Sequence, residues 1–288
     1  MDQRDTTTNQ ADWVIVMDSS CDVVEKVGAG GLDWLIAPLK IRVGDEEFVD
    51  DAKLDVSAMM RAIKAYAGET KSACPSVGEY AELFRRARNV ICITISSRLS
   101  ASYETALQAR DLVLAEDPSR NIHVIDSRAT SGRAVLLAEE IERLVAEGLP
   151  FEEVAARADE YRDNAMLFFS LASFDNLIKN GRMPRYQGML GQILRMRPVA
   201  MADPEGNIEV LDKPRGEKAM MRTMLERMTQ FKDMTGKPVI IAHCNAEEVA
   251  NRVRAMLEAT GLPSDIRVIP TRGLCSFYTD EGGFILNY

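Results

Sequence analysis

Short apolar runs that alternate with helical periods restrict the fold of this chain more than any other feature. Four runs of apolar and β-branched residues mark the first half: Trp13–Asp18, Trp34–Val43, Val90–Ser96 and Ile122–Asp126. Such runs are typical of strands buried on both faces of a sheet. Apolar residues at helical spacing separate them, over Val56–Ala67, Val77–Arg88, Ala101–Ala115 and Arg128–Glu147. The alternation predicts a parallel sheet with helices on both faces.

The second half follows another pattern. The runs Pro198–Ala202 and Ile208–Pro214 flank the turn ADPEGN, whose Gly-Asn pair indicates a hairpin. Further strands are expected over Met166–Ala172, Pro238–His243, Ile266–Thr271 and Gly283–Tyr288, and helices over Phe174–Lys179, Glu217–Met234 and Ala246–Thr260. Hairpins mixed with helices predict a mixed sheet layered with helices. In a chain of 288 residues, the change of pattern predicts two α/β domains, 1–164 and 165–288.

Charge and the lack of long apolar segments exclude several function classes. The chain carries 44 acidic and 35 basic side chains, and an acidic surface repels phosphate, so no nucleic-acid partner is expected. The longest uncharged stretch, Asn164–Phe174, is shorter than the roughly 18 residues of a membrane helix, so no stable membrane insertion is expected. The first ten residues are polar and contain no signal-peptide core. Five scattered cysteines indicate neither a disulfide framework nor a zinc site, so we expect a cytoplasmic protein without metal or cofactor.

Hydroxyl side chains follow three of the predicted strands. Ser19 and Ser20 follow the first, the segment Ser96–Ser102 follows the third, and Ser127 and Thr130-Ser131 follow the fourth. Ligands of parallel sheets bind at the carboxyl ends of strands, where helix starts favour anions. The sequence therefore predicts an anion site at this edge of the sheet.

The alternative for these hydroxyls is helix capping. Ser76 and Glu79 match the capping box, and Ser100 or Ser102 could cap the next helix. Similarly, Gly181 before Arg182 is typical of a helix C-cap, and the arginine could also reach back to an anion held by the first domain.

Catalysis has little support in the sequence. The chain has two histidines, His123 and His243, and no G-x-S-x-G motif, so a serine triad lacks its base. Cys74 precedes a helix start, which could lower the pKa of its thiol. A small-molecule hydrolase that uses Cys74 or Ser100 stays open as an alternative.

Several of these motifs together resemble the DegV family of fatty-acid-binding proteins. VIVMDSSCDV at residues 14–23 is similar to the family's strand and Asp-Ser-x-x-Asp turn, and SACPS at 72–76 stands where the family has Thr-Ser-Gln-Pro-Ser. The segment Ile95–Tyr103 resembles a Ser-Ser-x-Leu-Ser-Gly-Thr-Tyr run, and Asn180-Gly181-Arg182 resembles a Gly-Gly-Arg turn. The motifs follow the family's order from Val14 to Glu248.

This resemblance implies a two-domain α/β protein that holds a long-chain fatty acid in an apolar tunnel. It also implies a partner, a fatty acid kinase that phosphorylates the presented carboxylate, and a binding protein without catalytic activity of its own. By position, the carboxylate contacts would be Ser72, Ser100 and Arg182, with Ser97 in the same serine run.

The chain departs from the family near its end. The family has a His-Thr-Gly-Pro-Gly segment, and this chain has Tyr278-Thr279-Asp280-Glu281-Gly282, so Tyr278 or Thr279 would donate a hydroxyl in place of the histidine. A degenerate member that no longer binds fatty acid and acts as a regulatory partner is therefore another alternative. Flexible methionines suit tunnel walls as well as cores, and the candidates are Met59, Met60, Met166, Met183, Met189 and Met196.

Overall fold

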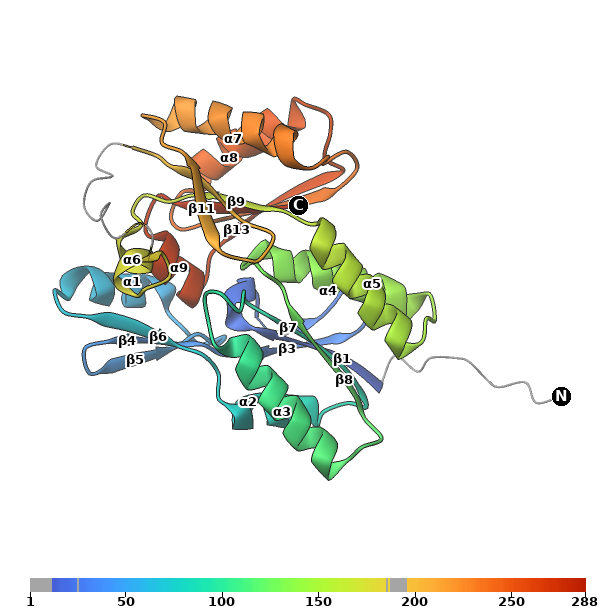
Figure 1. Cartoon of the computed structure of the whole chain (residues 1–288). Helices are drawn as coiled ribbons and strands as arrows, with labels where there is room; N and C mark the ends of the chain where they lie inside the picture. The colour runs from blue at the N-terminus through green and yellow to red at the C-terminus, as the bar shows by residue number, and fades with distance from the viewer. Residues whose placement is uncertain (1–11, 25, 185, 187–195) are drawn as a thin grey trace.

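Two large sheets, each covered by helices, form the body of the protein (Figure 1). The computed structural model describes residues 12–24, 26–184, 186 and 196–288. The first sheet has the strand order β2-β3-β1-β7-β8. Its strands are β1 (Trp13–Asp18), β2 (Lys26–Val27), β3 (Asp33–Ala37), β7 (Asn89–Thr94) and β8 (Asn121–Asp126). β3, β1, β7 and β8 run parallel, and β2 pairs antiparallel at the edge, so the predicted parallel sheet is confirmed.

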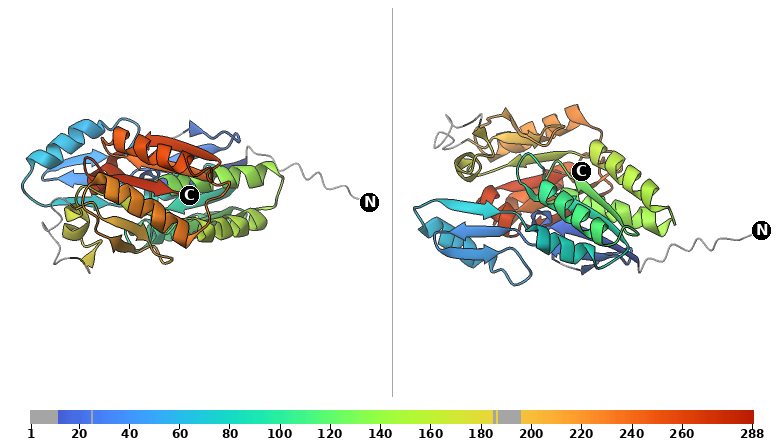
Figure 2. Two further views of the ribbon diagram at one scale, coloured as in Figure 1. Left: turned by 90° about the horizontal axis from the view of Figure 1, so that it is seen from above. Right: turned by 60° about the horizontal axis from the view of Figure 1, so that its bottom comes forward.

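Both faces of the first sheet are buried, as its apolar strands require. All six residues of β1 are buried, and the side chains alternate between two cores. Ile15 and Met17 pack with α4 and α5, whereas Val14 and Val16 pack with α2 and α3. These helices are α2 (Val77–Phe84), α3 (Ser102–Glu116), α4 (Gly132–Ala146) and α5 (Phe151–Asn164), and they lie in pairs on opposite sides of the sheet (Figure 2).

The second sheet is mixed and has the order β11-β10-β9-β14-β12-β13. Its strands are β9 (Leu167–Ser170), β10 (Val199–Ala202), β11 (Ile208–Asp212), β12 (Pro238–His243), β13 (Asp265–Pro270) and β14 (Phe284–Asn287). β12 and β13 are parallel, the other pairs are antiparallel, and β10 and β11 form the predicted hairpin. Two helices, α7 (Glu217–Phe231) and α8 (Glu247–Glu258), cover one face, and α4 touches the other.

A third, small sheet was not predicted. The run Trp34–Val43 divides after Ala37 into β3 and β4 (Lys40–Val43), and β4 pairs antiparallel with β5 (Glu46–Val49) and β6 (Thr70–Ala73). The segments EEFV and TKSA are charged and half exposed, so they lack the apolar alternation that identifies strands. As a consequence, Ser72 lies on a strand and not in a loop.

The short helices show which capping predictions hold. Besides α1 (Val56–Ala65), the chain forms η2 (Ser19–Cys21), α6 (Asp175–Lys179) and α9 (Gly273–Thr279). Ser76 and Glu79 form the predicted capping box of α2. Ala101, and neither Ser100 nor Ser102, occupies the N-cap position of α3, although Ser100 Oγ accepts the amide of Ser102, the first residue of the helix.

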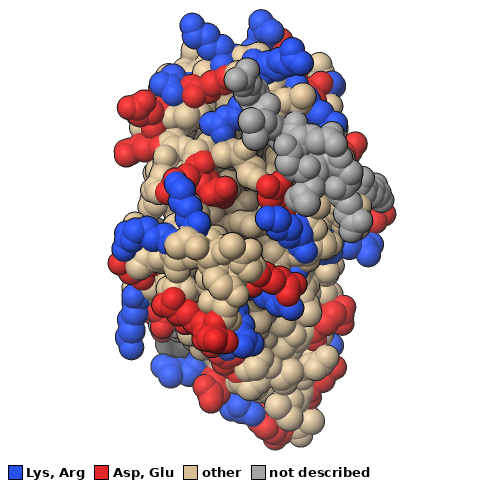
Figure 3. Space-filling view, turned by 90° about the vertical axis from the view of Figure 1, so that its left-hand side faces the viewer, with Lys and Arg blue, Asp and Glu red and all other residues tan. Residues whose placement is uncertain are grey.

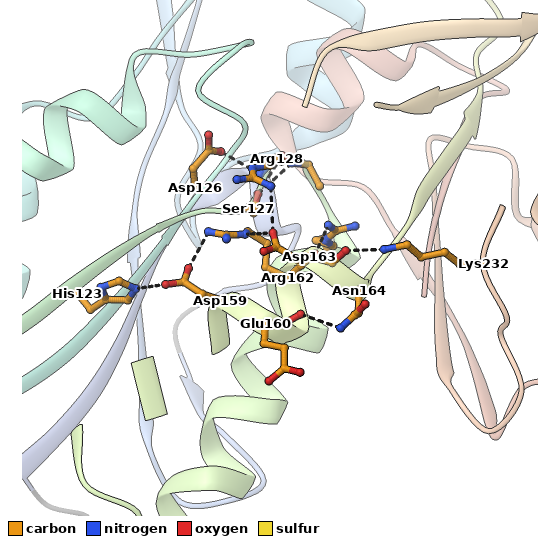
Figure 4. Close-up of polar contacts among 12 residues, drawn as sticks. His123, Asp126, Ser127, Arg128, Asp159, Glu160, Arg162, Asp163, Asn164 and Lys232 are labelled. Atoms are coloured by element: carbon orange, nitrogen blue, oxygen red, sulfur yellow. Dashed lines mark hydrogen bonds and ion pairs between the residues drawn. The ribbon is translucent and has the colours of Figure 1, made fainter. Parts of the chain in front are cut away.

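Polar contacts at the end of α5 connect the two halves of the chain (Figure 4). Lys232, at the end of α7, donates to the carbonyl oxygen of Asp163 and so joins the second half to the first. Within the first half, the guanidinium of the buried Arg133 donates to the carbonyl oxygen of Arg162 at 2.7 Å. Cations are favourable at this negative end of a helix dipole. Burial lowers the pKa of Arg133 to about 10.

The strands of the first sheet all precede residue 164 and those of the second all follow it, and the domain boundary there remains a prediction.

A buried carboxylate ties the edge of the first sheet to α4, and its removal tests that packing. Glu142 is 3% exposed and accepts hydrogen bonds from the indole Nε1 of Trp34 and the amide of Gly30, both at 3.1 Å. Glu142→Ala removes both acceptors and leaves a void, so the free energy of unfolding should fall by about 2–4 kcal/mol in urea denaturation. The exposed Glu147→Ala should change it by less than about 0.5 kcal/mol, and equal effects of the two variants would contradict this account.

Candidate ligand-binding site

An apolar cavity lies where the first sheet, the second sheet and α9 meet. The strand β9 shows how the sequence builds its wall, because Leu167, Phe169 and Leu171 face the cavity while Phe168 packs in the core below α7. The apolar lining consists of Leu39, Ile95, Leu99, Ala129, Leu167, Phe169, Leu171, Leu177, Ala202, Ile208, Leu274 and Ile285. The cavity volume is about 80 Å³. Typical ligand pockets have about 300–1,000 Å³, so a long ligand requires these side chains to move apart.

Five of the six sequence-predicted site residues line this cavity. They are Ser72, Ser100, Arg182, Tyr278 and Thr279, which four separate segments of the chain contribute. The Ser72 and Tyr278 hydroxyls lie 2.8 Å apart and share a hydrogen bond. Ser100 Oγ accepts the Ser102 amide at 3.2 Å. Burial raises the pKa of Tyr278, so its hydroxyl keeps its proton and can donate it in a hydrogen bond.

Arg182 reaches across the cavity from a helix end. At the end of α6, the amide of Gly181 donates to the oxygen of Ile178 and the amide of Arg182 donates to that of Leu177, which is a Schellman motif. Gly181 has a φ of +76°, which favours glycine at this position. The Arg182 Nε donates to the oxygen of Leu99 at 3.0 Å. The predicted C-cap is therefore confirmed, and it aims the guanidinium at the serine loop.

Ser97 lies near the site but is not among the residues that line the cavity. Its amide donates to Asp126 Oδ1 at 3.1 Å, at the end of β8. A contact between Ser97 and a ligand therefore stays a prediction of the sequence alone.

The two acidic residues that replace the family's glycine and proline point away from the cavity. Glu281 pairs with Lys64 of α1 at 3.4 Å, and Asp280 accepts the Glu281 amide at 2.8 Å. Neither side chain lines the cavity. On the side of the molecule that Figure 3 shows, acidic and basic side chains are interspersed. The surface charge is thus compatible with an anionic group inside.

The hydroxyls that follow β1 and β8 were predicted as anion ligands, but three of these serines donate to buried aspartates instead. Ser20 Oγ donates to Asp18 at 2.5 Å, Ser19 Oγ donates to Asp50 at 2.9 Å, and Ser131 Oγ donates to Asp22 at 2.6 Å. The sequence pattern placed these hydroxyls correctly at the sheet edge but could not show that they form hydrogen bonds with aspartate carboxylates.

Burial dominates the electrostatics of these aspartates. It raises the pKa of Asp18 to about 6 and that of Asp22 to about 7, and it also raises the pKa of Asp50. Hydrogen bonds from serine hydroxyls and backbone amides act in the opposite direction and offset part of the desolvation.

The methionines predicted for the walls lie elsewhere. None of the described residues that line the cavity is a methionine. Met59, Met60, Met166 and Met183 are core residues, and Met196 is half buried. Met189 lies outside the described residues. Leucine and isoleucine make up most of the apolar lining.

The side chains that the sequence offered for catalysis lie outside the cavity lining, apart from Ser100. His123 bonds to Asp159 and His243 accepts the Ala246 amide, and neither histidine lines the cavity. Cys74 is half buried, with its sulfur 3.7 Å from Thr105 Oγ1. Within the described ranges, no three side chains are arranged so that they could hold a metal ion, and no helix has the length and apolar character to cross a bilayer.

The fold and the cavity define a class of α/β protein with two helix-covered sheets and an apolar pocket between them. The DegV family, described as "Uncharacterised protein, DegV family", matches residues 12–286. The chain belongs to the DegV family.

Its relatives include proteins solved with fatty acids. A DegV domain-containing protein of Streptococcus pneumoniae is 37% identical over 277 residues, which cover 96% of this chain and 98% of the relative. The S. pneumoniae Fatty Acid Kinase (Fak) B3 protein, loaded with linoleic acid, is similar in structure, with a TM-score of 0.91, 37% identity and coverage of 96% and 98%. A DegV family protein from Eubacterium eligens, loaded with heptadecanoic acid, has a TM-score of 0.90, 30% identity and the same coverage.

The raised pKa of Asp22 predicts a pH-dependent stability. Between its unfolded pKa near 4 and its folded pKa of about 7, Asp22 binds more protons in the folded state, so stability is lost as pH rises through this range. Asp22→Asn lacks this titration. From pH 4.5 to 8, the free energy of unfolding of the wild type should fall by about 1–4 kcal/mol relative to the variant, measured by urea denaturation. A difference between the two proteins that does not change with pH would contradict the assignment.

Proposed function

We propose that this protein binds one long-chain fatty acid, with its acyl chain in the apolar cavity and its carboxylate at Ser72, Ser100, Arg182 and Tyr278, beside Thr279. The observation that carries the proposal is the composition of the cavity, whose wall is mostly apolar apart from these hydroxyls, the side chains of Arg182 and Arg128 and a few other polar groups. The fatty acids in the structures of the S. pneumoniae and E. eligens relatives support the same ligand class.

Hydrocarbon burial supplies the affinity in this proposal. Each buried CH₂ contributes about 0.8 kcal/mol, so a chain of about sixteen carbons contributes roughly 10 kcal/mol before the costs of association. Part of this free energy opens the narrow cavity. The guanidinium and the hydroxyls then determine the orientation of the ligand, because only its carboxylate end can accept strong, charge-assisted hydrogen bonds.

The proposal extends to a partner and to a division of the chain. The protein presents the carboxylate to a fatty acid kinase and carries out no chemistry itself. The Fak B3 relative supports the kinase, and the distance of both histidines from the cavity supports a role without catalysis. Residues 1–164 and 165–288 act as two domains that meet at the carboxylate. A cytoplasmic location agrees with five free cysteines.

Lipid extraction tests the ligand class directly. The purified protein should release long-chain fatty acids in about equimolar amount, identified by mass spectrometry. A protein that neither contains nor takes up palmitate would refute the proposal and favour the degenerate, non-binding alternative.

Substitutions at the carboxylate contacts should reduce ligand retention. In Ser100→Ala and Arg182→Ala, loss of one hydrogen bond to a charged group predicts an affinity for palmitate lower by about tenfold to a hundredfold. Native mass spectrometry of the purified variants measures the occupancy. The exposed Ser57→Ala and Arg222→Ala serve as matched controls, and full occupancy in all four variants would remove these residues from the site.

The hydrolase alternative makes an opposite prediction at Cys74. If the protein is a carrier, Cys74→Ala should keep palmitate occupancy within about twofold of the wild type, because the thiol lies outside the cavity lining. Screening both proteins against thioester and ester substrates checks the alternative, and a turnover that the substitution abolishes would favour the enzyme.

A further inference from the structure

Three buried aspartates connect the loops that line the cavity, although none of them lines it. Asp18 and Asp22 flank η2, Asp50 follows β5, and their exposed fractions are 1%, 5% and 1%. We refer to these three residues as the aspartate cluster. Its contacts are with backbone amides and serine hydroxyls of segments that are far apart in the sequence.

Asp50 holds the start of α9. Its Oδ1 accepts the Gly273 amide and its Oδ2 accepts the Leu274 amide, both at 2.9 Å, and Ser19 Oγ donates to Oδ2 at 2.9 Å. The first amides of a helix have no partner within the helix, so Asp50 caps α9 from another part of the chain. A Cβ on Gly273 would lie 2.6 Å from the Asp50 carboxylate, which explains the glycine.

This cap determines where the polar groups of the cavity lie. α9 has seven residues, and its last two, Tyr278 and Thr279, are proposed carboxylate donors. In Figure 1, α9 lies beside α1 and α6, at the level where the two halves meet. A helix of two turns is only marginally stable by its own hydrogen bonds. The buried side chains of Leu274 and Phe277 pack α9 in place, and the bonds to Asp50 add a polar anchor at its start.

The other two aspartates act on neighbouring loops. Asp22 Oδ1 accepts the Arg272 amide at 2.7 Å, and its Oδ2 accepts Ser131 Oγ, which joins the start of α9 to the loop that contains Ala129 and Thr130. Asp18 Oδ2 accepts the Ile95 amide at 2.8 Å, directly before the loop of Leu99 and Ser100. The aspartate cluster therefore contacts the residue before the loop of Leu99 and Ser100, the loop that follows β8 and the start of α9.

We propose that Asp18, Asp22 and Asp50 are positioning residues that align the carboxylate donors of the cavity without contacting the ligand. The inference rests on the proposed function. It assigns a role to the Asp-Ser-Ser-Cys-Asp turn that differs from ligand binding. Because the donors act on the carboxylate, loss of their alignment should weaken binding of an acid more than binding of an alcohol of the same length.

The variant Asp50→Asn distinguishes a role in aligning the carboxylate donors from a role in the general stability of the fold. The amide group keeps the shape but turns one acceptor oxygen into a donor that faces the Gly273 or Leu274 amide. The delipidated variant and wild type are titrated with palmitate and with hexadecan-1-ol in a calorimeter. We expect palmitate affinity to fall by about tenfold, the effect of one buried unpaired group, and hexadecanol affinity to fall by less than about threefold.

The neighbouring Asp51→Asn is the matched control, since Asp51 accepts the Lys53 amide within its own exposed turn. It should leave the acid-to-alcohol ratio unchanged. If Asp50→Asn does not fold, Ser131→Ala decides instead, because it removes one donor to Asp22 and leaves the Arg272 amide bonded. That variant should lower the ratio by about threefold.

The outcomes distinguish the inference from the proposed function. Suppose that the wild type binds palmitate more tightly than hexadecanol. If the variant then loses affinity for both ligands by the same factor, or for neither, the positioning role is overturned. A wild type that binds palmitate no better than hexadecanol would instead overturn the carboxylate site itself.

Discussion

Hydrogen bonds that backbone amides donate to buried carboxylates at the edge of the first sheet are the interaction on which the cavity depends. Parallel strands bring their carboxyl ends to one edge, and the loops that leave it carry amides that pair with neither sheet nor helix. Asp18, Asp22 and Asp50 accept these amides. Burial opposes their ionisation, as the raised pKa values of all three show, and the bonds they accept offset part of that cost.

Affinity and orientation have different physical sources in this architecture. The aliphatic wall from β9, β14, α6 and α9 can bury hydrocarbon without any directional contact. Direction comes from a few polar groups, and Arg182 is the most constrained of them because a Schellman turn and the Leu99 oxygen hold it at both ends. The replacement of the family's histidine segment by Tyr278 and Thr279 keeps hydroxyl donors at this place, and the new acids face the surface.

Sequence patterns predicted the large elements well because burial on both faces leaves a strong signal. β1 and β12 were predicted to the residue, and the β10–β11 hairpin followed from its turn. The sequence patterns missed β2, η2, α5, α9 and the strands β5 and β6 of the small sheet. β5 and β6 are short and half exposed, and α9 is held by Asp50 and Asp22, which lie more than 200 residues away in the sequence. Five of the six predicted site residues line one cavity, and the resemblance to the family, more than any local pattern, selected them.

The sequence by itself determined the class of fold, the order of most helices and strands along the chain and the presence of hydroxyls at the edge of the sheet. It could do so because periodicity and turn chemistry are local properties of the chain. Only the tertiary structure decided which hydroxyls face the cavity and which bind aspartates, since Ser72 meets Tyr278 across 206 positions and Ser19 meets Asp50 across 31. It also decided that leucine and isoleucine, and no described methionine, form the wall. A side chain's direction depends on the elements packed against it, and local spacing carries no information about those partners.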